Sequence, residues 1–181
     1  METKADPSLS RATVNNQSEL KKVMTLDGEI ASHSNVENRN QQLVISKCGT
    51  LWLLDYDDFV TVKISTIHTN AVNKAEVVSS EHTGESYLFT CSDDGSLKIS
   101  NLVNLEQSLE IYKPRKQAKT FNIEGSFSLV SFGEEVFIYS KIDPNNMTAE
   151  LSSLGSFKLD SLVIDIKNIP TTENYYILTE T

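Results

Sequence analysis

Residues 87–102 read YLFTCSDDGSLKISNL and carry the clearest structural signal in this 181-residue chain. Two runs of β-branched, aromatic and aliphatic residues flank a short polar segment, which is the pattern of two strands joined by a tight turn. The segment contains Asp93, Asp94 and Gly95. Aspartate tolerates left-handed backbone geometry, and glycine adopts positive φ without steric cost. The stretch therefore predicts a β-hairpin whose turn includes Asp94 and Gly95.

The same pattern occurs again on both sides of this hairpin. It is found as LVISKCGTLWLLD at 43–55, as LVSFGEEVFIYS at 129–140, and as a first half, YILTET, at 176–181. In a gapless alignment Ser46, Ser92 and Ser131 coincide, so the units repeat after 46 and then 39 residues. These spacings bracket the ~40–45 residues of one blade in a common type of β-propeller. We assign structural turn roles to the glycines at the equivalent turns, Gly49 and Gly133.

Two further β-like runs follow each complete hairpin. They lie at 60–65 and 75–78, at 109–112 and 120–123, and at 156–159 and 162–166. Four strands per repeat, in regular order, predict an all-β propeller with about three and a half blades, which is an incomplete ring. An all-β sandwich is the alternative, and the turn chemistry that recurs at fixed register favours the propeller.

The segment SDDGSLKISN at 92–101 resembles the closing part of a WD40 repeat, in which a Ser-x-Asp turn precedes a strand that ends in Trp-Asp. The resemblance covers about residues 43–181, with degenerate repeats, and identifies no particular member of the family. It implies that Asp94 stabilises the turn.

The chain also departs from the family pattern. Ser100 and Asn101 stand where Trp-Asp is usual, while Cys48 and Gly133 replace the turn aspartate in the first and third units. The Gly-His pair that often precedes a blade is missing throughout. We therefore expect that the family's Asp–His–Ser–Trp hydrogen-bond network does not form here.

The chain divides into two regions. Residues 1–40 are rich in serine and asparagine with weak apolar clustering, which predicts a mostly disordered arm with a strand at 20–30. Residues 41–181 form the partial propeller. A propeller with so few blades cannot close, and we expect its open carboxyl-terminal edge to pair with missing blades or a partner. We interpret the chain as part of a longer protein or its truncated product, with a partner-completed half-propeller as the alternative.

Composition limits the partners. The formal net charge is −9, which argues against non-specific binding to nucleic acid or to an anionic membrane. No run approaches the ~18 apolar residues of a membrane span, and the amino terminus lacks the apolar run of a secretory signal. Cys48 and Cys91 are not in a CxxC pair, so we expect reduced thiols. These features predict an intracellular protein, cytoplasmic or nuclear, that is not secreted.

No catalytic, metal-binding or cofactor-binding residues are predicted. His33, His68 and His82 fall in the arm or in loops, without neighbours at metal-ligand spacing, and we expect them to be solvated. No Gly-x-Ser-x-Gly elbow or phosphate-binding glycine loop is present. A dispersed Ser–His–Asp triad is not excluded by sequence, because its members need not be neighbours. We expect a protein that is not an enzyme and carries no cofactor.

One basic cluster stands out on this acidic chain: Lys113, Arg115, Lys116 and Lys119. It is the candidate partner-binding site, and loop 113–119 is where contact with RNA phosphate would be expected. The alternative interpretation is a solvated inter-strand loop in which Pro114 blocks strand extension.

The resemblance implies a non-catalytic scaffold that binds other proteins, as the WD-repeat subunit of an intracellular multiprotein complex. Two alternatives stay open. One is a fragment of a propeller enzyme or of a small-molecule-binding propeller with its site at the central channel. The other is a non-functional truncated product.

Overall fold

The computed structural model describes residues 28–36, 40–56, 61–80, 83–103, 108–143, 146 and 151–181, and for 61–66 it describes the backbone. These residues form strands and turns, and no helix long and apolar enough to cross a membrane occurs among them. The strands are β1 (Ile30–Val36), β2 (Gln41–Ser46), β3 (Thr50–Asp55), β4 (Thr61–Thr66), β5 (Val72–Ser79), β6 (Ser86–Ser92), β7 (Ser96–Asn101), β8 (Ser108–Tyr112), β9 (Ala118–Asn122), β10 (Phe127–Phe132), β11 (Glu135–Ser140), β12 (Ser153–Lys158), β13 (Val163–Asn168) and β14 (Tyr175–Thr179).

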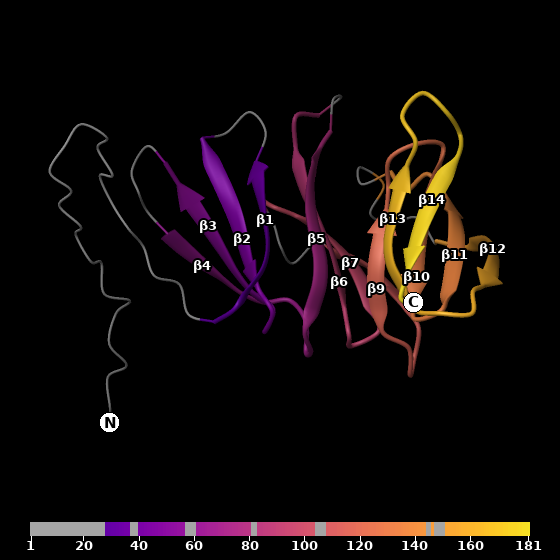
Figure 1. Ribbon diagram of the computed structural model, residues 1–181. Coiled ribbons are helices and arrows are strands. Elements are labelled where there is room, and N and C mark those ends of the chain that lie inside the picture. The colour runs from indigo at the N-terminus through magenta and orange to yellow at the C-terminus, as the bar shows by residue number, and fades with distance from the viewer. Residues whose placement is uncertain are drawn as a thin grey trace, which may run out of the picture.

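The strands group into successive antiparallel sheets that stand side by side (Figure 1). Blade 1 is β1-β2-β3-β4, blade 2 is β5-β6-β7-β8, blade 3 is β9-β10-β11-β12, and β13-β14 form a two-stranded sheet. Each blade is a meander in which consecutive strands are neighbours. The first strand of each blade lies close to the first strand of the next, as at the centre of a propeller. The predicted three and a half blades, in an unclosed arrangement, are confirmed.

The central strands read as near-continuous apolar runs because both of their faces are buried between blades. All seven residues of β6 are buried. Leu88 packs in a cluster with Leu43 and Leu51 of blade 1. Phe89, on the opposite face, lies 6.1 Å from Phe121 of blade 3, measured between ring centroids. Each large apolar side chain buried in this way contributes about 1.5–3 kcal/mol, so packing between blades holds the structure together.

The turns of the central hairpins lie at the positions that the sequence predicts, next to Gly49, Gly95 and Gly133. The amide of Gly95 donates to the carbonyl of Ser92 at 3.1 Å, and the amide of Gly49 donates to Ser46 at 3.0 Å, so blades 1 and 2 share one turn geometry. In blade 3, Phe132 pairs directly with Glu135, which leaves a two-residue turn that begins at Gly133. Gly95 and Gly133 have φ of +88° and +68°, in the left-handed region that favours glycine.

The folded region begins earlier than the predicted boundary at residue 40. Strand β1 covers Ile30–Val36, inside the predicted arm, and the predicted strand at 20–30 meets it at Ile30 only, since residues 20–27 lie outside the described residues. The hydroxyl of Ser32 donates to the carbonyl of Ala75 at 3.2 Å on the neighbouring blade. The small side chain of Ser32 lets the inner strands β1 and β5 approach closely. The prediction from composition instead interpreted the serines of this segment as a sign of disorder.

Candidate functional site

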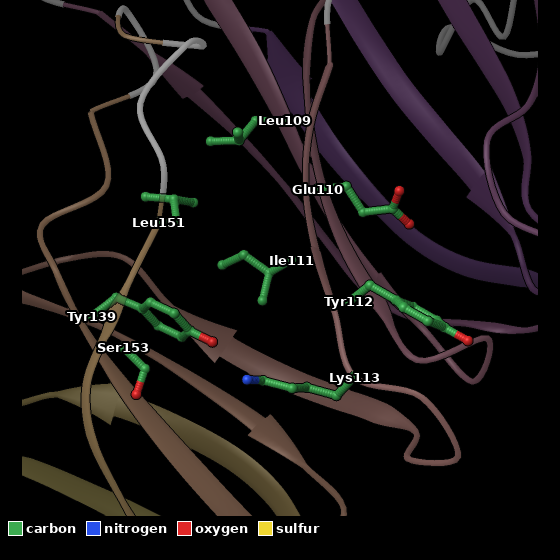
Figure 2. Close-up of a pocket in the computed structure, with 8 residues that line it drawn as sticks. All are labelled: Leu109, Glu110, Ile111, Tyr112, Lys113, Tyr139, Leu151 and Ser153. Carbon is green, nitrogen blue, oxygen red and sulfur yellow. The ribbon is translucent and has the colours of Figure 1, made fainter.

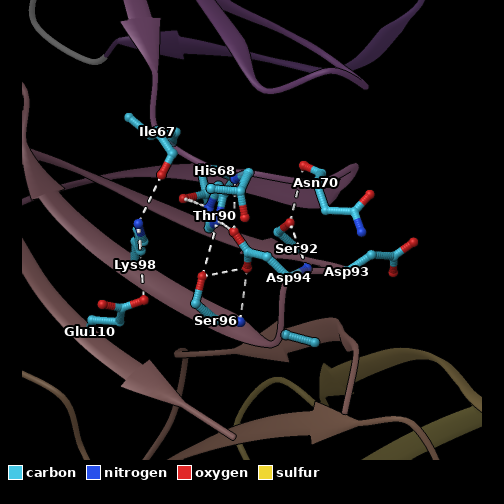
Figure 3. Close-up of polar contacts among 12 residues, drawn as sticks. Ile67, His68, Asn70, Thr90, Ser92, Asp93, Asp94, Ser96, Lys98 and Glu110 are labelled. Carbon is cyan, nitrogen blue, oxygen red and sulfur yellow. Dashed lines mark hydrogen bonds and ion pairs between the residues drawn. The ribbon is translucent and has the colours of Figure 1, made fainter. Parts of the chain in front are cut away.

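A buried polar network joins the loop between blades 1 and 2 to two parts of blade 2 (Figure 3). We call it the His68 network, formed by His68, Thr90, Asp94 and Ser96. The Nδ1 atom of His68 lies 3.0 Å from Asp94 Oδ2, and its Nε2 atom lies 2.8 Å from Thr90 Oγ1. The hydroxyl of Ser96 donates to Asp94 Oδ1 at 2.6 Å. The network therefore connects the β4–β5 loop to strand β6 and to the β6–β7 turn.

The environment fixes the protonation of the network. Burial lowers the pKa of His68, so the imidazole is neutral at pH 7. Burial alone would raise the pKa of Asp94, but hydrogen bonds from Ser96 and from the Thr69 amide, the latter at 3.1 Å, lower it to about 2. Nδ1–H therefore donates to the Asp94 carboxylate, and Nε2 accepts from the Thr90 hydroxyl.

The order carboxylate, imidazole, hydroxyl is also that of a catalytic triad, but the burial of the hydroxyl argues against catalysis here. Thr90 is 0% exposed and His68 is 5% exposed. A nucleophile must reach the carbonyl or phosphoryl group that it attacks, and Thr90 Oγ1 instead lies inside the sheet. The geometry is that of a structural network that fixes a turn and a loop to a strand.

Two sequence-based expectations are wrong at this point. His68 is buried instead of solvated, and the carboxylate, imidazole and hydroxyl members of the family network form although Ser100 occupies the tryptophan position. The sequence signal for this network is the histidine His68, which lies 26 residues before the turn aspartate Asp94. It was missed because Ile67 replaces the glycine that usually precedes this histidine. His33 lies in β1 with its Nδ1 3.3 Å from Gln42, and His82 lies outside the described residues.

The equivalent turns of blades 1 and 3 lack the aspartate that accepts hydrogen bonds in the turn of blade 2. Cys48 stands at the position of the turn aspartate, with its Sγ 2.9 Å from the Ser46 hydroxyl. Hydrogen bonds from Ser46 and Thr50 lower the pKa of this exposed thiol to about 7. Gly133 has no side chain to accept hydrogen bonds. Among the described residues the aspartate–histidine network therefore occurs in blade 2.

The buried imidazole predicts a loss of stability on mild acidification. The unfolded chain takes up a proton on His68 near pH 6.5, whereas the folded chain does so at lower pH. The stabilising contribution is complete above pH 6.5 and falls by up to about 1.4 kcal/mol per pH unit below it. Urea denaturation of wild type and His68→Gln at pH 7.5 and 5.5 tests this. We expect the stability gap between the two proteins to narrow at pH 5.5, and an unchanged gap would contradict a buried neutral imidazole.

The structure places the basic cluster at the junction of blades 2 and 3. Its three lysines interact with residues of the neighbouring blade or turn. The contacts are a salt bridge of Lys119 Nζ with Asp93 at 2.7 Å, a salt bridge of Lys116 with Glu135, and a cation–π contact of Lys113 Nζ at 4.3 Å from the Phe137 ring centroid.

Arg115 differs from these lysines. It is exposed, lies in the left-handed region with φ of +62°, and forms no salt bridge with a described residue. The four cations therefore do not form one uniform patch. Partner binding by this loop stays a prediction, and Arg115 is the member best placed for it. No group of three or more His, Cys, Asp or Glu side chains that could hold a metal occurs in the part of the chain that the structure describes.

The meandering blades have the architecture of a β-propeller, and the His68 network resembles the polar network of WD40 repeats. No protein-family model matches the sequence. Over 87 residues, 48% of the chain, it is 33% identical to WD repeat-containing protein 90 of Xenopus tropicalis. Over 83 residues it is 34% identical to the protein of that name from Homo sapiens. The matched segment spans 4% of the length of these relatives.

The fold comparison agrees with the sequence comparison. The crystal structure of the WD40 β-propeller domain of Doa1 superposes with a TM-score of 0.66 at 18% sequence identity, and the match covers 87% of this chain and 50% of that chain. The resemblance to WD40 repeats is therefore confirmed. The likeness to Doa1 concerns the fold.

Proposed function

We propose that the chain is a non-catalytic protein-interaction scaffold that acts as a WD-repeat subunit of a multiprotein complex. The observation that carries the proposal is the outer face of the β13–β14 hairpin. There Ile164, Tyr176 and Leu178 are 49%, 54% and 55% exposed, while the opposite face packs on blade 3 through Ile166 and Ile177. Exposed apolar patches of this kind are typical of surfaces that pack against another protein.

The backbone of the same hairpin supports the proposal. Strands β2, β6 and β10 each pair with a strand on both sides, whereas β14 pairs with β13 alone among the described strands. An edge with unpaired N–H and C=O groups accepts an added strand. The free side of β14 beside the exposed apolar side chains supports the proposal that another protein packs here, and the identity of that partner stays a prediction.

The absence of catalysis is part of the proposal. Two observations support it: the hydroxyl of the one triad-like arrangement described above is buried, and WD40-type propellers generally serve as non-catalytic platforms. An intracellular location, cytoplasmic or nuclear, is also proposed. It is supported by Cys48 and Cys91, which are free thiols.

The proposal predicts that charge on this hairpin face prevents partner binding. The double variant Tyr176→Asp, Leu178→Asp places two carboxylates on the apolar face, and we expect at least a tenfold loss of co-purifying partners from cell extract, measured by quantitative mass spectrometry. Val103→Asp is the matched control, because Val103 is 67% exposed on blade 2 and lies outside this face. It should retain the partners.

A thermal-shift screen of the chain against small metabolites tests the alternative that it is a small-molecule-binding propeller. Partner recovery that is equal for wild type and the double variant, together with reproducible stabilisation by a small metabolite, would overturn the scaffold proposal in favour of a small-molecule site.

A further inference from the structure

A pocket of about 340 Å³ lies between blades 2 and 3, away from the His68 network (Figure 2). Strand β8 forms one wall, and Tyr139 of β11 and Ser153 of β12 form the other, with Leu151 between them in sequence. Leu109, Ile111 and Leu151 are the aliphatic part of a lining that also includes Glu110, Lys113 and Ser153. Its volume is at the low end of the ~300–1,000 Å³ of ligand pockets, so the occupant is small.

One end of the pocket carries an unsatisfied polar group. The side chain of Tyr139 is 1% exposed, and its hydroxyl has no hydrogen-bond partner among the described residues. Burial raises the pKa of this phenol to about 12, so it is protonated at neutral pH and able to donate. A buried polar group without a partner destabilises the folded state, and a ligand that accepts a hydrogen bond from it would remove that penalty.

The same end of the pocket is electropositive. Figure 2 shows the Tyr139 hydroxyl and the Lys113 ammonium directed toward one another across the cavity. Lys113 lies over the Phe137 ring and forms no salt bridge with a described residue, because the neighbouring Glu135 is bound by Lys116. The positive charge of Lys113 is therefore not neutralised by a direct ion pair.

The remaining charge at the pocket does not oppose an anion. Glu110 lines the cavity, but its carboxylate lies 3.9 Å from Lys98 Nζ and points away from the Tyr139 end (Figure 2). Ser153 also lines the Tyr139 side, and its hydroxyl donates to the carbonyl of Gly155 at 3.2 Å.

We propose that this pocket binds a carboxylate carried on a small apolar group. The carboxylate accepts hydrogen bonds from the Tyr139 hydroxyl and the Lys113 ammonium, while the apolar group packs against Leu109, Ile111 and Leu151. One cation, one neutral donor and aliphatic walls match a monoanion with a hydrocarbon body. The source is either a free small acid or the carboxyl-terminal residue of a peptide. The site goes beyond the scaffold function and does not depend on it.

The test is a titration of the full chain followed by ¹H–¹⁵N NMR. The free-acid probe is 4-methylpentanoate and the peptide-terminus probe is N-acetyl-leucine, and each has its neutral amide as control. We expect saturable shifts of the amides of residues 109–113 with the acids and at least tenfold weaker binding of the amides. Whichever acid binds more tightly identifies the source.

Three variants assign the contacts. Tyr139→Phe and Lys113→Gln should each weaken acid binding about tenfold or more. Lys47→Gln, which removes the same charge from the β2–β3 turn of blade 1, outside the pocket, should not. Tyr139→Phe removes an unsatisfied hydroxyl and keeps the ring, so its thermal midpoint should equal or exceed that of wild type. If Tyr139→Phe fails to fold, the acid affinity of Lys113→Gln alone tests the proposal. No binding of either acid, equal binding of the amides, or unchanged affinity in Lys113→Gln would overturn the proposal.

Discussion

Gly95→Ala is expected to destabilise the fold by about 2–5 kcal/mol. Gly95 has φ of +88°, where an alanine costs roughly 1–2 kcal/mol. A Cβ atom there would also lie 2.6 Å from the carbonyl oxygen of Lys116 and 2.7 Å from that of Lys113. These are backbone atoms of the β8–β9 loop, so the loop that joins blades 2 and 3 must move, at a further cost of about 1–3 kcal/mol.

Gly84→Ala is the matched control for this prediction. Gly84 has φ of +69°, but a Cβ atom there would meet no heavy atom within 4 Å. Its cost is that of the backbone conformation alone, about 1–2 kcal/mol. Urea denaturation followed by the fluorescence of the single tryptophan, Trp52, measures both. Equal destabilisation by the two variants would show that the contact between the turn and the loop carries no energy.

The blades were predictable from sequence because their determinants are local. Strand alternation and the turn chemistry around Asp94, Gly95 and Gly133 are properties of a few consecutive residues, and they gave the hairpins and the number of blades. Strand β1 was missed because it is held by backbone pairing with β2 and by contact with β5 on the next blade, while Val36 is its one buried residue. The serines of Ile30–Val36 carry no apolar signal of their own.

The candidate sites were less predictable, because they depend on residues far apart in the chain. His68 meets Asp94 and Thr90 through the β4–β5 connection, and nothing next to His68 in sequence indicates this. The orphaned hydroxyl of Tyr139 arises from packing between two blades and has no local sequence signal. The basic cluster was visible as charge, but its salt bridges to the neighbouring blade appear only in three dimensions.

The turn aspartate of blade 2 should contribute more to stability than its counterpart in blade 1. Asp94→Ala removes the acceptor for the Ser96 hydroxyl and amide, for the Thr69 amide and for His68 Nδ1. Loss of these bonds leaves buried donors without partners, and we expect a cost of about 3 kcal/mol. Cys48→Ala at the equivalent turn is the control. Cys48 is exposed, so its removal should cost less than about 1 kcal/mol.

The lowered pKa of Asp94 predicts how the stability of wild type and of Asp94→Ala will differ as the pH falls. The pKa of Asp94 is lowered from 3.8 to about 2, so the folded state holds this carboxylate ionised more strongly than the unfolded chain does. Its contribution of about 2 kcal/mol is present above pH 4 and is lost as the pH falls from 4 to 2. Wild type should therefore lose stability more steeply than Asp94→Ala across that interval. Parallel curves would contradict an ionised, hydrogen-bonded Asp94.

A double-mutant cycle separates a connected network from independent contacts. If Asp94 and His68 act as a unit, the double variant Asp94→Ala, His68→Ala should be less destabilised than the two single variants predict together, by at least about 1 kcal/mol. The reason is physical: once the carboxylate is gone, Nδ1–H of the buried imidazole has lost its charged acceptor and keeps only the Ser96 hydroxyl at 3.1 Å, so part of what His68 contributes is already lost in Asp94→Ala. Additive effects at pH 7.5 would instead mean that the 3.0 Å contact between Nδ1 and Oδ2 contributes no coupling energy.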